Sequence, residues 1–127
     1  MNIEQFLLEK ELTKDEAKEV IISDRFADEE GTPLPFKIKQ IDRLKLNELG
    51  IRAKKTGEFL DILVIEEACI EPNFKSVELQ NHYGVANAYD LINKILLSGE
   101  CMRLTNEICK ANDILTSFDS LVDQAKK

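Results

Sequence analysis

Residues 58–70 read EFLDILVIEEACI, and this stretch decides the fold because it is apolar on nearly every side. A helix of that kind belongs at the centre of a hydrophobic core, where other elements cover all of its faces. A buried strand is the alternative interpretation, but Glu66 and Glu67 would break it. The helix ends at Glu71, because the residue before a proline disfavours helical geometry. The apolar positions of the stretch are Phe59, Leu60, Ile62, Leu63, Val64, Ile65 and Ile70.

An antiparallel β-hairpin over residues 19–41 is predicted to precede this helix. Val20, Ile22 and Phe26 recur on one face of an extended chain, which begins with a β-branched run. After the turn-rich loop ADEEGTP, apolar residues alternate with lysines from Phe36 onward, as in a half-buried strand with a charged outer face. A lone hairpin is marginal in water, so we expect it to pack on helices.

Helices are predicted for most of the remaining chain. Apolar residues at helical spacing indicate a short N-terminal helix over residues 2–10. Residues 42–112 form the helical part, and residues 113–127 repeat the amphipathic pattern in a C-terminal helix. The expected fold class is therefore α+β and mostly α, with a β-hairpin followed by a small helical bundle in a single domain of residues 1–127.

Capping residues and glycines divide the helical part. Gly50 is expected to interrupt a short element that contains Leu44 and Ile51. Ser76 and Asn87 are placed to cap the next two helices, because their side-chain oxygens can accept hydrogen bonds from the first turn. A further helix is expected over residues 100–111. Its inward-facing residues are expected to be Met102, Leu104, Ile108 and Cys109.

The composition excludes several classes of protein. A net charge of −7 and a pI near 4.8 disfavour general binding to nucleic acid, because phosphates would be repelled. No stretch approaches the ~20 apolar residues that cross a membrane. Three cysteines, an odd number without paired spacing, indicate a reducing compartment. We expect a soluble cytoplasmic protein with neither a nucleic-acid nor a membrane partner.

The charge is distributed unevenly along the chain. Residues 1–30 hold ten acidic against four basic residues, and residues 56–100 hold eight against two. Residues 37–55 hold seven basic against two acidic residues. This basic stretch could form an anion or partner site, or it could solvate a strand edge and neutralise acidic neighbours, as charge runs usually do. Its basic residues are Lys37, Lys39, Arg43, Lys45, Arg52, Lys54 and Lys55.

Few side chains are suited to catalysis. His82 is the only histidine, which removes most metal sites and most acid–base schemes. Cys101 and Cys109 lie too far apart on one helix to share a metal, so packing is their simpler role. Glu66 and Glu67 point apart on a helix and cannot share a proton. We therefore expect no enzyme, no catalytic residue, no metal and no cofactor.

The stretch from Glu71 to Ala111 reads EPNFKSVELQNHYGVANAYDLINKILLSGECMRLTNEICKA. It contains a Glu-Pro-Asn-Phe turn, then Glu-Leu-Gln, and after two residues Tyr-Gly-Val. A leucine-rich helix and a Gly-Glu helix start follow. Upstream, residues 23–41 supply an acidic loop with a glycine and a Phe-Lys-Ile-Lys strand. In this order and spacing the chain resembles the XkdN-like phage tail assembly chaperones over most of residues 20–112. Ser98 stands where family members often have proline, which concerns local geometry only.

The resemblance implies a role in assembling a phage or prophage tail within the bacterial host cytoplasm. Such chaperones are thought to bind the long, helical and aggregation-prone tape measure protein until tube subunits polymerise around it. The resemblance therefore implies the tape measure protein as partner, and absence of the chaperone from the finished particle. A structural tail component that remains in the particle is the alternative function.

Two segments are candidate partner-binding surfaces. The first is Tyr83-Gly84-Val85, because tyrosine offers a large apolar face with a polar tip and glycine permits a tight turn. Alternatively, Tyr83 and Val85 simply pack the corner between two helices. The second is the C-terminal helix, which could dock onto a partner or support self-association with a second copy. Its candidate residues are Leu115, Phe118, Leu121 and Val122.

Overall fold

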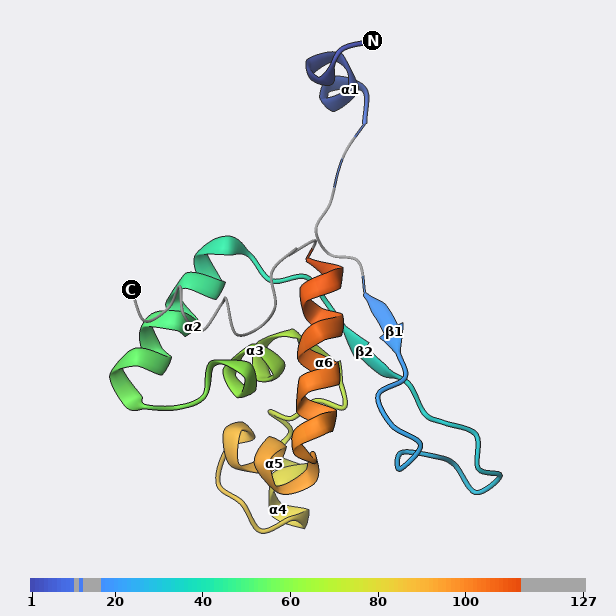
Figure 1. Cartoon of the computed structure of the whole chain (residues 1–127), viewed down its shortest axis with the longest axis vertical. Coiled ribbons are helices and arrows are strands. Elements are labelled where there is room, and N and C mark those ends of the chain that lie inside the picture. The colour runs from blue at the N-terminus through green and yellow to red at the C-terminus, as the bar shows by residue number, and fades with distance from the viewer. Residues whose placement is uncertain (11, 13–16, 113–127) are drawn as a thin grey trace.

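A computed structural model of the chain describes residues 1–10, 12 and 17–112. Within these residues it contains six helices and a three-stranded antiparallel sheet, which confirms the mostly-α α+β class (Figure 1). In chain order the elements are α1 (Ile3–Glu9), β1 (Lys18–Val20), β2 (Phe36–Ile38), α2 (Arg43–Thr56), α3 (Leu60–Ala68), β3 (Cys69–Glu71), α4 (Val77–His82), α5 (Ala88–Ile95) and α6 (Ser98–Ala111).

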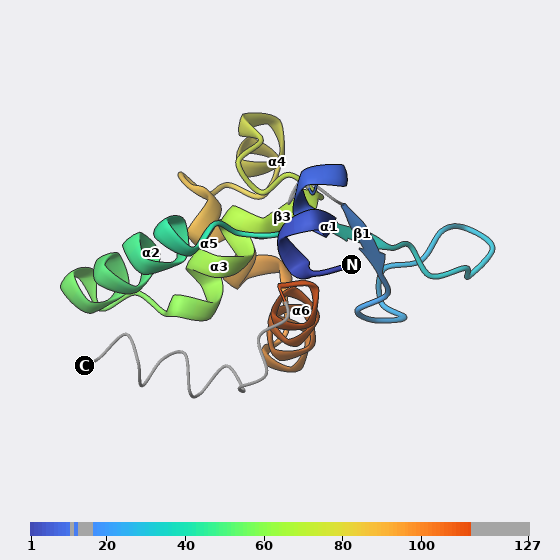
Figure 2. The same cartoon turned by 90° about the horizontal axis from the view of Figure 1, so that it is seen from above.

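Helix α3 forms the buried centre of the protein, as its apolar pattern predicts. Helices α2, α5 and α6 all pack against it. Figure 2 shows these helices gathered around α3 from a second direction. Phe59 and Ile70, at the two ends of the apolar stretch, are exposed because both lie outside the helix. The buried residues of α3 are Leu60, Ile62, Leu63, Val64, Ile65 and Ala68.

The sheet has one strand more than the sequence pattern predicts. Strand β1 pairs with β2, and Val20 lies opposite Phe36. Strand β3 pairs with the other edge of β2, and Cys69 lies opposite Ile38. The backbone turns extended at Cys69, directly after α3, so the predicted helix ends earlier than expected and its last residues join the sheet. Each strand is only three residues long.

Helix α2 differs from the expected interrupted element. It runs through Gly50 as one helix of 14 residues, because a single glycine costs only about 1 kcal/mol relative to alanine. The helix ends at Gly57, whose φ of 77° provides a left-handed cap. Leu44 and Ile51 do not pack inward, since Leu49 and Gly50 occupy the buried face.

The remaining helices begin at side-chain caps. Ser76 accepts a hydrogen bond from the backbone N–H of Leu79, and Asn87 accepts one from that of Asp90. Helix α6 starts at Ser98, two residues before the predicted start. Met102 was expected to face inward. It is instead 65% exposed, because the buried face of α6 is formed by other residues of the helix. That buried face comprises Glu100, Cys101, Leu104, Thr105, Ile108 and Cys109.

No helix within the described residues is long and apolar enough to cross a membrane. The predicted C-terminal helix over residues 113–127 lies outside the described residues, as do its candidate residues Leu115, Phe118, Leu121 and Val122.

Candidate functional site

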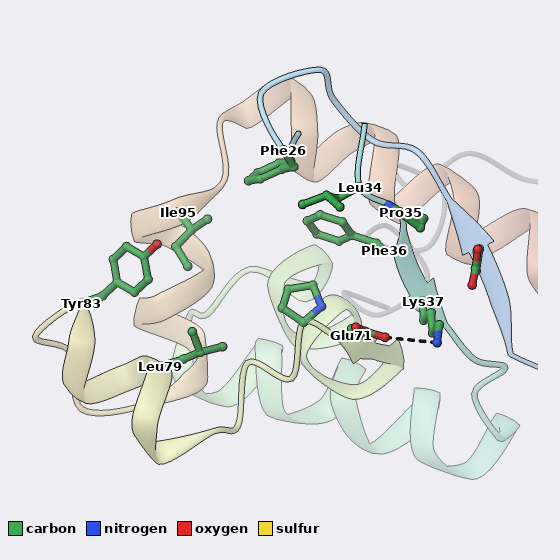
Figure 3. A pocket seen from close by; sticks show the side chains of 11 residues that line it. Phe26, Leu34, Pro35, Phe36, Lys37, Glu71, Leu79, Tyr83 and Ile95 are labelled. Atoms are coloured by element: carbon green, nitrogen blue, oxygen red, sulfur yellow. Dashed lines mark ion pairs between the residues drawn. The ribbon is translucent and has the colours of Figure 1, made fainter. Parts of the chain in front are cut away.

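A groove of about 490 Å³ opens between the β1–β2 connection, the sheet and α4 (Figure 3). Most of the side chains that line it are apolar, and its charged groups come from the three strands of the sheet. The lining residues are Glu19, Phe26, Leu34, Pro35, Phe36, Lys37, Glu71, Pro72, Leu79, Tyr83 and Ile95.

One wall of the groove comes from the two arms of the β1–β2 connection. The ring centroids of Phe26 and Phe36 lie 5.1 Å apart, at an interplanar angle of 58°. The backbone N–H of Leu34 donates to the carbonyl of Phe26 over 2.7 Å and ties the arms together. Leu34 remains 48% exposed, so this wall presents an apolar side chain to solvent.

The tip of the connection is shaped by an acidic turn. The carboxylate of Asp28 accepts hydrogen bonds from the backbone N–H groups of Glu30 and Thr32, each over 2.9 Å. Gly31 supplies a φ of 85°, which side-chain-bearing residues rarely adopt. The acidic loop with a glycine, noted in the sequence, therefore positions the apolar wall beside it.

The opposite wall comes from α4 and the end of α5. Figure 3 shows Tyr83 and Ile95 facing Phe26 and Leu34 across the groove. Tyr83 is 38% exposed and directly follows the last turn of α4, where Leu79 also contributes to the wall.

The three residues of the Tyr-Gly-Val segment have different positions. Tyr83 lines the groove. Gly84 has a φ of 70° and turns the chain toward α5. Val85 is half-buried and packs against the hydrophobic core. Of the segment, only Tyr83 is therefore in a position to touch a bound partner within the groove.

An ion pair between half-exposed Arg25 and buried Glu100 joins the two walls. The guanidinium of Arg25 donates to the carboxylate of Glu100 through Nε at 3.0 Å and through Nη2 at 2.6 Å. Nη2 also donates to the carbonyl of Ile95 at 2.6 Å, and the guanidinium lies over the ring of Phe26. Because Phe26 and Ile95 belong to opposite walls, Arg25 fixes the width of the groove.

Glu100 is fully buried and retains its charge. Its carboxylate also accepts a hydrogen bond from the backbone N–H of Leu97 at 2.8 Å, which caps α6. The hydrogen bonds from Arg25 outweigh the opposing effect of burial and lower the pKa of Glu100 to about 2. Arg103 adds a second tie between α6 and the connection, because its Nε donates to the carbonyl of Ile22 at 2.8 Å.

Sequence reasoning missed the pair of Arg25 and Glu100. Glu100 stands three residues after Leu97 at a helix start, where an acidic side chain reaches back to the cap. That local signal predicts the capping bond. No local signal links Glu100 to Arg25, because 75 positions separate them.

The rim of the groove carries a small excess of negative charge. Lys37 of the central strand β2 forms an ion pair of 3.3 Å with Glu71 of the neighbouring strand β3. Glu19 lies opposite Lys37 in the sheet register and adds a second carboxylate.

The cysteines and the histidine outside the groove are not arranged for catalysis or metal binding in the described part of the chain. Burial raises the pKa of Cys69 to about 12 and that of Cys101 to about 11, and it raises the pKa of Cys109 as well. These thiols remain protonated and packed in the core. His82 is exposed, and its ring lies edge-on to Tyr83 at 5.0 Å. Among the described residues, no three His, Cys, Asp or Glu side chains cluster so as to hold a metal ion.

The chain matches known proteins along nearly its whole length. The family described as phage XkdN-like tail assembly chaperone protein matches residues 3–126. The phage-like element PBSX protein XkdN of Bacillus subtilis is 27% identical, over 95% of this chain and 90% of that protein. The uncharacterized protein YqbN of the same organism is 26% identical, over 95% and 91%. The crystal structure of YqbN superposes with a TM-score of 0.72 at 25% identity, and covers 89% of this chain and 97% of that chain.

Proposed function

The chain belongs to the phage XkdN-like tail assembly chaperones, and we propose that it binds the tape measure protein through the groove beside Tyr83. Binding takes place in the bacterial cytoplasm, before tube subunits enclose the tape measure protein. The observation that carries this proposal is an open apolar groove in a member of an assembly chaperone family. The role requires binding and release, and no catalytic step.

The groove suits an apolar helical stripe as its occupant. An amphipathic helix binds a groove through anchors at positions i, i+3, i+4 and i+7, and apolar walls receive such anchors. Leu34 and Tyr83 both present exposed surface toward the groove from opposite walls. Tyr83 offers a ring for apolar contact and a hydroxyl for a polar group at the edge of the helix.

The charge of the rim selects among apolar helices. Glu19 and Glu71 outnumber Lys37, and the protein as a whole carries a net charge of −7. Complementary charge speeds association and suppresses unsuitable partners. The bound segment of the tape measure protein therefore carries basic residues beside its apolar stripe.

Reversible binding follows from the shape of the site. The groove is open to solvent, and its contacts come from few side chains, so an occupant can leave without unfolding the chaperone. A tube that encloses the tape measure protein covers the same apolar stripe and replaces the chaperone.

Co-expression with the tape measure protein of the same phage or prophage tests the proposal. The tape measure protein alone is expected to be insoluble, and co-expression is expected to yield a soluble complex that copurifies through a tag on the chaperone. The chain should also be absent from purified particles. An insoluble tape measure protein, together with this chain in purified particles, would instead establish a structural tail component.

A further inference from the structure

Helix α1 stands apart from the other helices and the sheet (Figure 1). None of its seven residues is buried. Ile3 and Leu8 are 71% and 81% exposed, and Leu7 is 54% exposed. Isolated helices shorter than about 12–15 residues are marginal in water, so α1 needs a surface on which to pack.

One face of α1 is apolar with acids on both sides. Ile3, Phe6 and Leu7 follow the i, i+3, i+4 spacing that places side chains on one face of a helix. We call these three residues the α1 stripe. At 100° per residue, Glu4 and Glu9 lie on opposite flanks of the stripe. Among residues 1–10, the one base is Lys10, whose ammonium lies 5.7 Å from the centroid of the Phe6 ring.

The outward side of α2 has the complementary pattern. Leu44 and Ile51 lie seven residues apart on one face and are 79% and 49% exposed. At 100° per residue, Lys55 lies on the same face, and Arg43 and Lys54 lie along one flank of it. We call these five residues the α2 face.

The bases of the α2 face have no acidic partner among residues 1–10, 12 and 17–112. The neighbouring bases of α2 differ, since Lys45 pairs with Glu48 and Arg52 pairs with Glu58. Glu48 lies on the same side of α2, and its ion pair with Lys45 spans 3.7 Å. The face therefore keeps a net positive charge around an apolar centre.

We propose that the α1 stripe of one copy docks on the α2 face of a second copy. Glu4 and Glu9 then lie among bases, and both sets of exposed apolar side chains are covered. Helix α1 lies apart from helix α2 of its own chain in both views, so a second copy is the favoured occupant (Figures 1 and 2). Reciprocal docking closes a two-fold dimer and leaves neither surface open.

The connection between α1 and the body permits this exchange. Residues 10–17 join α1 to β1. Eight residues span at most about 26–29 Å when fully extended. In the proposed dimer the basic stretch of residues 37–55 serves the partner role rather than solvation alone.

Sedimentation equilibrium of the full chain tests the dimer directly. The wild-type chain is expected to dimerise, and Leu44→Asp or Ile51→Asp is expected to raise the dimer Kd at least about tenfold. The same effect is expected for Ile3→Asp. Met102→Asp is the matched control, because Met102 is also exposed but lies on α6. Circular dichroism confirms that each variant is folded.

Charge reversal separates docking between copies from docking within one chain. Two double variants are needed, Glu4→Lys/Glu9→Lys and Lys54→Glu/Lys55→Glu. Each variant by itself is expected to be monomeric, because both α1–α2 contacts of its dimer would join like charges. A mixture of the two variants is expected to form a heterodimer, in which both contacts regain opposite charges. A monomeric wild-type chain, a dimer that survives Leu44→Asp and Ile51→Asp, or a mixture that does not associate would overturn the proposal.

Discussion

Glu100→Gln tests the ion pair that fixes the width of the groove. The carboxylate accepts two hydrogen bonds from Arg25, at 3.0 and 2.6 Å, and one from the backbone of Leu97 at 2.8 Å. Glutamine keeps one acceptor oxygen and turns an amide N–H group toward the guanidinium, so at least one charged hydrogen bond is lost. Such a bond contributes about 1.5–3 kcal/mol. Because Arg25 is half-exposed and can turn to water, we expect the free energy of unfolding to fall by about 2 kcal/mol at pH 7.

The pH dependence of this loss has a definite sign. Arg25 lowers the pKa of Glu100 from its ordinary 4.5 to about 2, against the effect of burial. A carboxyl group with a lowered pKa contributes its full stability above its unfolded pKa and loses that stability as the pH falls through the folded pKa. The stability difference between wild type and Glu100→Gln should therefore be constant above pH 5, shrink below about 4.5, and vanish near pH 2.

Urea unfolding at pH 7, 5, 4 and 3 measures this difference. The exposed pair of Glu48 and Lys45 provides the control, because Glu48→Gln should change stability little at any of these pH values. A difference below about 0.5 kcal/mol between Glu100→Gln and wild type at pH 7 would refute the reasoning, since surface substitutions produce as much. A difference that stays constant from pH 7 to pH 3 would refute it as well.

Three further predictions concern the core and the caps. The three cysteines should react with an aromatic disulfide reagent at pH 8 only after urea is added, because they are buried and burial raises the pKa of each thiol. Rapid reaction of the folded chain would contradict this prediction. Leu63→Ala should lower the free energy of unfolding by about 2–5 kcal/mol in a urea titration, because it opens a cavity at the centre of α3. Gly57→Ala should lower it by about 1 kcal/mol, because its φ is 77°, whereas Gly99→Ala at the start of α6 should not; equal effects would contradict the cap assignment.

Patterns that repeat within one element could be read from the sequence. The apolar run of residues 58–70 correctly predicted the central helix, because a helix buried on all sides needs no polar face. Ser76 and Asn87 correctly predicted helix starts, because the capping bond joins residues only three positions apart. The resemblance of residues 71–111 to the chaperone family also held, as the family match shows.

Features that depend on distant residues could not be read from the sequence. Strand β3 is three residues long and has no alternation of its own, so only its pairing with β2 defines it. Leu44 and Met102 fit a helical apolar pattern, yet neighbouring residues occupy the buried faces of their helices. Nothing in the sequence near Glu100 points to its partner Arg25, because that pair joins segments far apart in the chain.

Copurification of the tape measure protein with groove variants of this chain tests directly whether the groove binds that protein. Leu34→Asp places a charge in the groove wall at an already exposed position, and Met102→Asp places the same charge on α6, away from the groove. Leu34→Asp is expected to recover at least about tenfold less tape measure protein than wild type, and Met102→Asp is expected to recover the wild-type amount. Equal recovery with Leu34→Asp and wild type would contradict the assignment of the groove as the binding site.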